Sequence, residues 1–230
     1  MRFRNVTHLS FDCYGTLVDW ERGILDAFAA ASRLRAEPSE AGSVLEAYAE
    51  LEAAAEAGAY RPYREVLGEV LAGLGDRFGF EPSEAERAAF ADSVGDWRPF
   101  PDTVAALRRL RSRFRLVILS NVDDDLFART AERLEVPFDE VITAQQLGSY
   151  KPALRNFEAM FERLGIERTA LVHVAQSLFH DHAPAKRLGL ASVWIDRPSA
   201  RPGVGVAPAS AARPDLVFHD LATFADAAGV

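Results

Sequence analysis

Six short runs of apolar and β-branched residues alternate along the chain with longer stretches of helical pattern. The runs cover residues 6–12, 116–121, 140–144, 170–175, 192–196 and 215–218. The helical stretches cover residues 103–112, 124–134, 153–164 and 183–188, with proline or glycine at positions 101, 137, 165 and 189. Strands that alternate with helices form a parallel sheet covered on both faces. We therefore predict an α/β fold with a doubly wound, Rossmann-like parallel sheet.

The segment from residue 20 to residue 96 interrupts this alternation. It is rich in Ala, Glu, Leu and Arg, and its apolar residues recur at helical spacing, as at Leu45, Tyr48 and Leu51. Ser39 and Ser83, each followed by glutamate, are typical helix starts. We predict an inserted helical cap domain over residues 20–96, a core domain made of residues 1–19 and 97–230, and a long loop over residues 198–214.

Charge and composition exclude several classes of protein. A formal net charge of −8 argues against non-specific nucleic-acid binding, and no apolar run approaches the ~20 residues of a membrane span. The single cysteine, Cys13, fits a reducing compartment, and we assign it a place in the core and no chemistry. We predict a cytoplasmic protein without nucleic-acid or membrane partners. A homodimer stays open, because the cap carries aromatic residues such as Tyr48, Tyr60 and Tyr63.

Polar residues stand at or beyond the ends of the predicted strands. Asp12 ends the first apolar run, just before a turn at Gly15, and Ser120-Asn121, Lys151 and Asp181 follow later runs. Ligands of open α/β sheets bind beyond the carboxyl ends of the strands. Each of these residues alone is equally typical of a turn or an exposed position. Together they predict one site that joins a carboxylate nucleophile, anion-binding groups, a cation and a second carboxylate.

Residues 11–20, which read Phe-Asp-Cys-Tyr-Gly-Thr-Leu-Val-Asp-Trp, resemble the first motif of the haloacid dehalogenase superfamily. The later motifs are matched in order by Ser120-Asn121, Lys151-Pro152 and Asp181. Phosphatases of the superfamily carry a second aspartate where this chain has Tyr14, and use it to protonate the leaving alcohol. A halide leaves without a proton. The chain is therefore most similar to the 2-haloacid dehalogenase branch, and a hydrolase is predicted.

The resemblance implies that Asp12 attacks the halogen-bearing carbon of a short 2-haloalkanoate, a small anionic organic substrate, and that water cleaves the resulting ester. The implied catalytic residues are Asp12, Thr16, Ser120, Asn121, Lys151 and Asp181. Thr16 and Asn121 would position Asp12, Lys151 would offset negative charge, and Asp181 would hold the water. Ser120 and backbone amides would bind the substrate carboxylate. Tyr14 and Trp20 would form a wall around the departing halide.

The chain departs from this branch at three places. The branch carries an arginine on an early cap helix that grips halide or carboxylate, and residues 43–56 contain none. Arg61 or Arg64 could substitute for it or could equally lie on the surface. Phe157 stands where the branch has tyrosine, and Ala175-Gln176-Ser177 stands where it has Ser-Ser-Asn. We include Arg61, Arg64, Phe157 and Ser177 among the predicted substrate-binding residues.

No cofactor and no obligatory metal are predicted. Phosphatases of the superfamily carry Gly-Asp where this chain has Ala175-Gln176, and Asp12 with Asp181 alone would be a poor magnesium site. His173, His180 and His182 lack the spacing of a zinc site, and we expect His173 to face the core or a helix. Two alternatives to dehalogenation remain: a small-molecule phosphomonoester phosphatase, and a non-catalytic protein that binds an anion or a partner on this fold.

Overall fold

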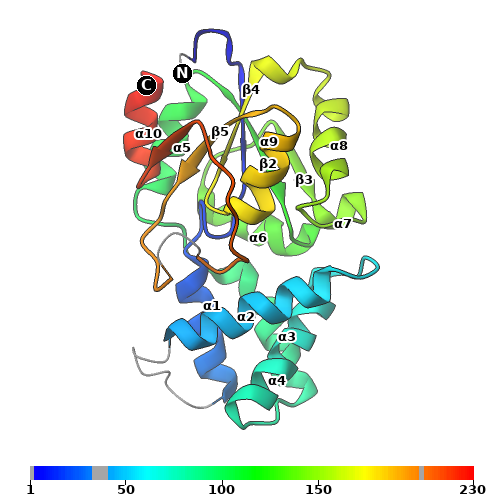
Figure 1. The fold of residues 1–230 in the computed structure, drawn as a ribbon. Coiled ribbons are helices and arrows are strands. Elements are labelled where there is room, and N and C mark those ends of the chain that lie inside the picture. The colour runs from blue at the N-terminus through cyan, green and yellow to red at the C-terminus, as the bar shows by residue number, and fades with distance from the viewer. Residues whose placement is uncertain (1–2, 33–40, 202–204) are drawn as a thin grey trace.

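The computed structural model of the chain describes residues 3–32, 41–201 and 205–230. Figure 1 shows two lobes: an α/β lobe that contains the sheet and both ends of the chain, and a helical lobe below it. The helical lobe follows the first strand in sequence, so the cap is an insertion into the core. Both features were predicted, and they place the first strand's carboxyl end next to the cap.

The sheet has six parallel strands in the order β3-β2-β1-β4-β5-β6. Their bounds are β1 His8–Phe11, β2 Arg115–Ser120, β3 Glu140–Thr143, β4 Leu171–Ala175, β5 Ala191–Ile195 and β6 Leu216–Phe218. All six predicted strands are present: the first is three residues shorter than predicted, the third, fourth and sixth are one residue shorter, and the second and fifth are shifted by one residue. The third ends at Thr143 because the side chain of Thr143 caps the next helix by accepting a hydrogen bond from the backbone N–H of Gln146.

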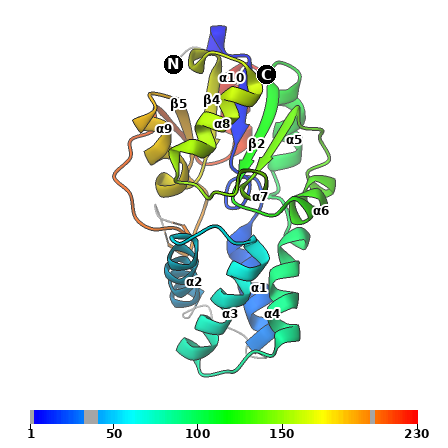
Figure 2. The same ribbon diagram turned by 90° about the vertical axis from the view of Figure 1, so that its right-hand side faces the viewer.

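Helices cover both faces of the sheet, as a doubly wound fold requires. In the core lobe they are α5 Thr103–Arg111, α6 Asp124–Leu134, α7 Ala144–Leu147, α8 Leu154–Leu164, α9 Ala183–Arg187 and α10 Leu221–Ala228. Short 3-10 turns lie at Phe3–Asn5 and Arg168–Ala170. Figure 2 shows α5 and α6 on one side of the sheet and α8 and α9 on the other. The α7 and α10 helices were not predicted.

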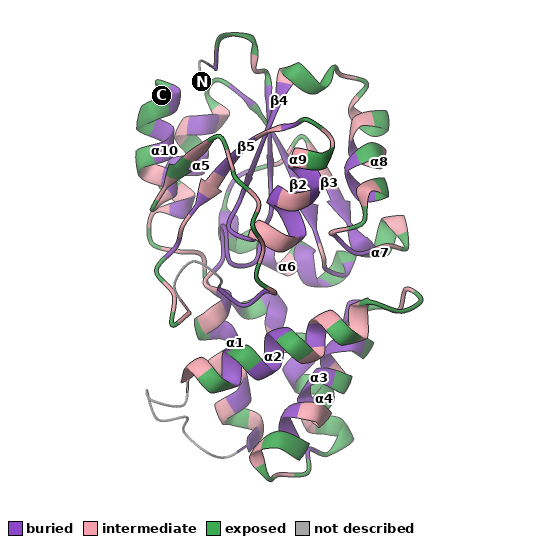
Figure 3. Cartoon of the chain, in the orientation of Figure 1, coloured by how far each residue is buried: buried purple, intermediate pink, exposed green. Residues whose placement is uncertain are grey.

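Alternate residues of β2 point into two different hydrophobic clusters. Leu116 and Ile118 belong to the larger cluster, whereas Val117 and Leu119 pack with Phe157 in a smaller one that α8 and α9 cover. This is the period of two that a strand buried on both faces imposes. Figure 3 accordingly shows the strands as buried and the outer faces of the helices as exposed.

The cap contains α1 Trp20–Ser32, α2 Ala41–Glu56, α3 Tyr63–Phe78, α4 Glu84–Asp92 and a 3-10 turn, Ser93–Asp96. The helix start predicted at Ser83 is confirmed, because Ser83 and Glu86 form a reciprocal capping box at the start of α4. The start predicted at Ser39 lies outside the described residues. The predicted loop over 198–214 contains no helix or strand in its described part, residues 198–201 and 205–214.

The cap tyrosines that left a homodimer open lie inside this chain. Tyr48 and Tyr63 are buried in the larger hydrophobic cluster, and Tyr60 packs against Tyr150, with 5.3 Å between ring centroids. A homodimer therefore stays a prediction without a surface to support it. No helix in the described part of the chain is long and apolar enough to cross a membrane.

Candidate active site

The site lies where the winding of the sheet changes direction. The β1 strand pairs with β2 on one side and β4 on the other, so the chain that follows β1 diverges from the chain that follows β4. Asp12 is the first residue beyond β1, and its backbone N–H donates to the carbonyl of Val174 at 3.1 Å. Gly15 then turns the chain at a φ of +89°, a conformation that favours glycine.

The ammonium group of Lys151 bridges two carboxylates. Its Nζ donates to Asp12 Oδ1 at 2.8 Å and to Asp181 Oδ1 at 2.7 Å. All three side chains are buried, with Lys151 at 2% exposure. A buried charge requires a partner, and here one cation compensates two anions. The structure thus brings together the nucleophile, cation and second carboxylate that the sequence placed on separate strand ends.

Thr16 holds the other oxygen of Asp12. Its hydroxyl donates to Asp12 Oδ2 at 2.6 Å and accepts the backbone N–H of Gln176 at 2.8 Å. Because Oδ1 is held by Lys151 and Oδ2 by Thr16, the carboxylate is fixed in rotation. This restraint agrees with the positioning role predicted for Thr16.

A chain of hydrogen bonds that the sequence did not reveal runs from Asp181 through His173 to Ser10. His173 Nε2 lies 2.9 Å from Asp181 Oδ1, and His173 Nδ1 lies 2.8 Å from the Ser10 hydroxyl. His173 and Ser10 are paired across β4 and β1, so strand register sets this contact. The expectation that His173 faces the interior is confirmed, and its link to Asp181 is new. The Oδ2 atom of Asp181 is buried and has no hydrogen-bond partner among the described residues.

A wide helical turn, Leu178–His182, brings Asp181 into the site. The backbone N–H groups of Asp181 and His182 both donate to the carbonyl of Ser177, at 3.2 Å each, and Ser177 caps the turn through the N–H of His180. Such π-type turns are rare and insert an extra residue into a helix. We predicted the helix only from residue 183, because apolar spacing does not distinguish this wider turn.

The electrostatics keep Asp181 ionised. Burial alone would raise the pKa of Asp181, but Lys151 and His173 outweigh it and hold that pKa below its usual range. The two carboxylates also raise the pKa of Lys151 against the effect of burial, so the lysine stays charged. Burial raises the pKa of Asp12, and the attraction of Lys151 opposes that rise. The ion pair with Lys151 therefore favours the ionised form of Asp12 against the effect of burial.

Ser120 is the last residue of β2, Asn121 follows it, and both line the same pocket as the two carboxylates. The Ser120 hydroxyl is buried and makes no hydrogen bond to any described residue, which leaves it available to a ligand. Among the described residues no hydrogen bond joins Asn121 to Asp12, so its predicted positioning of Asp12 is not direct. Its side chain accepts the backbone N–H of Lys151 at 2.7 Å and donates to the carbonyl of Lys151 at 3.0 Å. Asn121 therefore positions the lysine.

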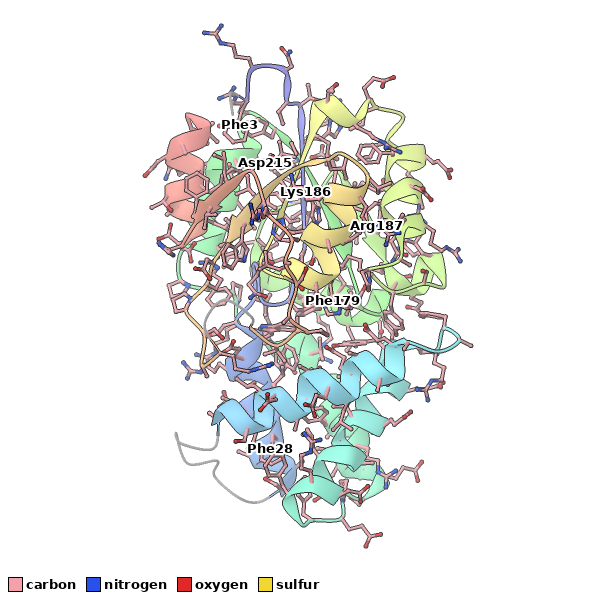
Figure 4. All side chains as sticks on the ribbon, viewed as in Figure 1. Phe3, Phe28, Phe179, Lys186, Arg187 and Asp215 are labelled. Atoms are coloured by element: carbon pink, nitrogen blue, oxygen red, sulfur yellow. The ribbon has the colours of Figure 1, made fainter. Side chains whose placement is uncertain are left out.

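A small pocket of about 30 Å³ encloses these groups. The residues that line it are Asp12, Tyr14, Trp20, Glu52, Glu56, Tyr63, Ser120, Asn121, Lys151, Ser177, His180 and Asp181. A larger cavity of about 410 Å³ adjoins it and shares Glu56, Lys151 and His180 with it. Phe179, labelled in Figure 4 where the core faces the cap, lines the larger cavity. The dimensions fit a ligand of a few heavy atoms.

Tyr14, Trp20 and Ser177 line the pocket, as predicted. The hydroxyl of Tyr14 is 2.9 Å from the hydroxyl of Thr130 on α6, so it is bound away from Asp12. Burial raises the pKa of Tyr14 well above its ordinary value, which keeps the phenol neutral. His180 also lines the pocket, and burial lowers its pKa to about 4.

Three of the predicted substrate-binding residues are not at the pocket. Arg61 pairs with Glu69 at 2.7 Å, and Arg64 pairs with Asp92 at 2.9 Å and with Asp125 at 2.5 Å. Both arginines pair with acidic residues at the surface and do not line the pocket, so neither takes the place of the missing cap arginine. Phe157 is fully buried behind the site, where its ring lies 5.2 Å from that of His173. It supports His173 and does not line the pocket.

The cap contributes two acidic residues that the sequence did not single out. Glu52 and Glu56 lie one turn apart on α2 and both line the pocket. Burial raises the pKa of Glu52 to about 7 and that of Glu56 well above its ordinary value. The sequence signal that could have identified this acidic wall is a glutamate, Glu52, on the buried face of a helix that is otherwise rich in alanine.

The donor set does not fit a divalent cation. The facing oxygens of Asp12 and Asp181 are both bound to the Lys151 ammonium group, and Gln176 turns its backbone N–H to Thr16. No cluster of three or more His, Cys, Asp or Glu suited to a metal occurs in the described ranges. Hard cations need several converging oxygens.

Comparisons with known proteins agree with this geometry. A family model described as a haloacid dehalogenase-like hydrolase matches residues 6–189. Haloacetate dehalogenase H-2 from Moraxella sp. (strain B) is 27% identical over 200 residues, covering 84% of this chain and 87% of that protein. Glyceraldehyde 3-phosphate phosphatase from Methanocaldococcus jannaschii is 32% identical over 103 residues, covering 43% and 44%. The solved L-2-haloacid dehalogenase of Xanthobacter autotrophicus has the same fold, with a TM-score of 0.80, 23% identity and coverage of 96% and 97%.

Proposed function

Because this chain belongs to the haloacid dehalogenase-like hydrolases, we propose that it hydrolyses the carbon–halogen bond of a short 2-haloalkanoate through an ester on Asp12. The similarity to haloacetate dehalogenase H-2 over most of both chains supports this activity. The observation that carries the proposal is the environment of Asp12. It is a buried carboxylate held by Lys151 and Thr16, and Tyr14 stands where a carboxylic acid would be needed to protonate an alcohol.

The first step is a displacement at carbon. An oxygen of Asp12 attacks the carbon that bears the halogen, the carbon–halogen bond breaks, and the halide leaves with the electron pair. Thr16 and Lys151 hold the attacking carboxylate in one orientation. Trp20 and the neutral ring of Tyr14 line the small pocket and limit the water around the leaving halide.

The second step is hydrolysis of the ester. Water attacks the carbonyl carbon of the esterified Asp12, a hydroxy acid leaves, and one proton is released for each turnover. The unpartnered Oδ2 of Asp181 is the acceptor that would hold this water, while His173 and Lys151 keep the other oxygen in place. Ser120, whose hydroxyl is also unpartnered, would bind the carbonyl end of the substrate.

A phosphatase is the second candidate, favoured by the 32% identity to a glyceraldehyde 3-phosphate phosphatase over part of the chain. Tyr14 and Gln176 oppose it, because they remove an acid and a carboxylate ligand that phosphoryl transfer with magnesium would use. A non-catalytic role on the same fold is the third alternative. The intact bridge between Asp12, Lys151 and Asp181 speaks against it.

The test is halide release from chloroacetate, fluoroacetate and 2-chloropropionate in the presence of EDTA. We expect release that EDTA does not affect and that Asp12→Asn abolishes. A mass increase confined to a peptide containing Asp12 after brief reaction would identify the ester. Magnesium-dependent release of phosphate from phosphomonoesters, without halide release, would favour the phosphatase. Ligand binding with neither activity would favour the non-catalytic alternative.

The compartment remains part of the proposal. A buried, unpaired Cys13 is compatible with reducing conditions, and we place the protein in the cytoplasm on that ground and on its composition.

A further inference from the structure

Four carboxyl groups share the small pocket with a single lysine. They belong to Asp12 and Asp181 in the core and to Glu52 and Glu56 in the cap. Lys151 is the one lysine or arginine among the described residues that line this pocket, and its ammonium group already binds both core carboxylates. The two cap carboxyl groups therefore lie together without a counterion of their own. A buried charge without a partner is costly, and an acid in such a place avoids that cost by keeping its proton.

The contacts of Glu56 determine which of its oxygens carries a proton. Asn121 accepts the backbone N–H of Lys151 at 2.7 Å through its Oδ1 atom, so its Nδ2 group is the donor. That group donates to the carbonyl of Lys151 at 3.0 Å and to Glu56 Oε2 at 3.3 Å. Because Oε2 is an acceptor, the proton of Glu56 belongs on Oε1, which makes no hydrogen bond to another described residue. Glu56 lines the pocket and can therefore offer it an O–H donor.

Glu52 and Glu56 differ in how well their surroundings stabilise a negative charge. Glu52 Oε1 accepts the hydroxyl groups of Tyr48, at 3.0 Å, and Tyr63, at 2.5 Å, and burial raises the pKa of Glu52 to about 7. Glu56 accepts one longer bond, from Asn121, among the described residues. Burial raises the pKa of Glu56 well above its ordinary value, Glu52 raises it further, and smaller effects oppose the rise. Of the two acids, Glu56 is therefore the one that keeps its proton at neutral pH.

The core side of the pocket supplies a second uncharged donor. The Ser120 hydroxyl is buried, makes no hydrogen bond to a described residue and lines the same pocket as Glu56. One O–H donor from the cap and one from the core match the two acceptor oxygens of a carboxylate. A hydrogen bond to an ionised carboxylate is about twice as strong as one between neutral groups. The pocket can thus bind an organic anion although its lysine is already engaged by Asp12 and Asp181.

We propose that the protonated carboxyl group of Glu56 recognises the 2-haloalkanoate by donating a hydrogen bond to its carboxylate, while Ser120 donates to the other carboxylate oxygen. The inference rests on the proposed function and deepens it, because it names the groups that bind the acid end of the substrate. The proton stays on Glu56, so the substrate does not meet a negative charge there. The halogen-bearing carbon is bonded directly to the carboxylate, and this arrangement therefore holds it in the small pocket that Asp12 lines.

Binding of the anion should weaken as the pH rises, because ionised Glu56 loses its donor and repels the substrate. The titratable and charged groups around Glu56 are Glu52 on the same helix, Tyr48, Tyr60 and Tyr63 in the cap, and Asp12, Tyr150, Lys151, His180 and Asp181 in the core.

Most of these groups keep one charge state from pH 7 to pH 10. Burial raises the pKa of each of the four tyrosines, so they stay neutral. Burial lowers the pKa of His180 to about 4, while Lys151 and Asp181 stay charged because each shifts the pKa of the other. Ionisation of Asp12 would raise the rate, which is the opposite sign. Above the pKa of Glu52, about 7, a decrease in substrate binding therefore reports on Glu56.

The test measures kcat and KM for chloroacetate from pH 7 to pH 10 in the wild type, Glu56→Gln and Glu56→Met. Glutamine cannot ionise, and its amide offers an acceptor to Asn121 and N–H donors to the substrate. Glu56→Gln should therefore stay within about threefold of the wild type at pH 7 and should lose the decrease in kcat/KM above pH 8. Methionine has a similar length but no donor, so Glu56→Met should lose about tenfold or more in kcat/KM, mostly through KM.

Glu50→Met is the matched control, since Glu50 lies on the exposed side of the same helix and pairs with Arg77. It should leave kcat, KM and the pH profile unchanged. The comparison of Glu56→Met with Glu56→Gln separates a donor from a charge, because both variants remove the ionisable group and only glutamine keeps a donor.

Binding supplies a second measurement that does not depend on turnover. Calorimetry of glycolate binding to Asp12→Asn at pH 9, in buffers of different ionisation enthalpy, should show proton uptake that adding Glu56→Gln reduces. Asp12-dependent halide release in which Glu56→Met matches Glu56→Gln, or in which Glu56→Gln leaves the pH profile unchanged, overturns this inference and leaves the proposed function standing. Absence of halide release from the wild type with every haloacid overturns the proposed function and this inference with it.

Discussion

Replacing Lys151 with methionine tests whether one cation holds two buried carboxylates together. Methionine retains much of the apolar length of lysine but removes the ammonium group that binds Asp12 and Asp181. Both carboxylates would then remain in a buried site without their shared partner. We expect Lys151→Met to lower the free energy of unfolding strongly at neutral pH and to abolish halide release.

The magnitude follows from the distances. At 2.8 and 2.7 Å and an effective dielectric constant of about 20, each ion pair contributes roughly 6 kcal/mol of attraction. Removing the ammonium group also removes the cost of burying it, which is several kcal/mol. The net loss should therefore be about 3–5 kcal/mol, as for other buried pairs that lose one partner. That is a large part of the ~5–15 kcal/mol by which a domain is stable.

The loss should depend on pH in a definite direction. Without Lys151 the pKa of the carboxylate pair in the folded protein rises above its unfolded value, so the folded state binds protons more tightly. The destabilisation is then fully present at high pH and shrinks as the pH falls through the raised pKa. We would measure urea unfolding by circular dichroism at pH 7.5 and pH 5, and expect a smaller deficit at pH 5. Adding Asp181→Asn should restore part of the stability at pH 7.5.

Lys186 provides the matched control. It pairs with Asp215, and their labelled side chains lie side by side in Figure 4, but both are partly open to solvent, at 27% and 44% side-chain exposure. Lys186→Met should therefore cost no more than about 1 kcal/mol. If Lys151→Met lost no more than this control, or lost the same amount at both pH values, the electrostatic account of the site would be refuted.

Three further predictions concern the cap and the turn after β1. Burial raises the pKa of Glu52 from 4.5 to about 7, so the folded state loses stability as the pH rises from about 4.5 to 7. Glu52→Gln should therefore raise the free energy of unfolding by on the order of 3 kcal/mol at pH 8 and by much less at pH 5, as measured by urea unfolding. Gly15→Ala should lower stability by more than about 1 kcal/mol and reduce kcat/KM, because the new Cβ would lie 2.7 Å from the Trp20 ring at a φ of +89°. Gly79 has a φ of +79° but open space around the position of a Cβ, so Gly79→Ala should show only the backbone effect on stability. Ser83→Ala should lower stability by about 1 kcal/mol through loss of the α4 capping box, a change visible in the thermal midpoint.

The core and the cluster of Asp12, Lys151 and Asp181 could be predicted because their signals are local in the sequence. A buried strand reads as a short apolar run, and the polar residue after it must lie at the sheet edge where ligands bind. Asp12 follows that rule directly, whereas Lys151 lies beyond β3 and α7, and Asp181 lies in the helical turn after β4. The winding of the sheet brings them within hydrogen-bonding distance.

Contacts set by register or by helix rotation were not predictable in this way. The link from Ser10 through His173 to Asp181 depends on which residues of β1 and β4 lie side by side. The surface positions of Arg61 and Arg64 depend on acidic partners, some of them far away in the sequence. The helical spacing of Leu45, Tyr48 and Leu51 predicted a helix, but not that Glu52 and Glu56 of α2 would line the pocket.

The division between core and cap also divides mechanism from selectivity. The core supplies Thr16 and Lys151, which hydrogen-bond to the Asp12 carboxylate, and these groups would act in the same way on any carbon that bears a good leaving group. What distinguishes one small halogenated molecule from another is the remainder of the pocket wall, to which the cap contributes Trp20, Tyr63, Glu52 and Glu56. A change in the cap residues of this wall can alter which substrate is preferred without altering the displacement at carbon. Similarity to haloacid dehalogenases therefore predicts the chemistry of this chain better than it predicts its substrate.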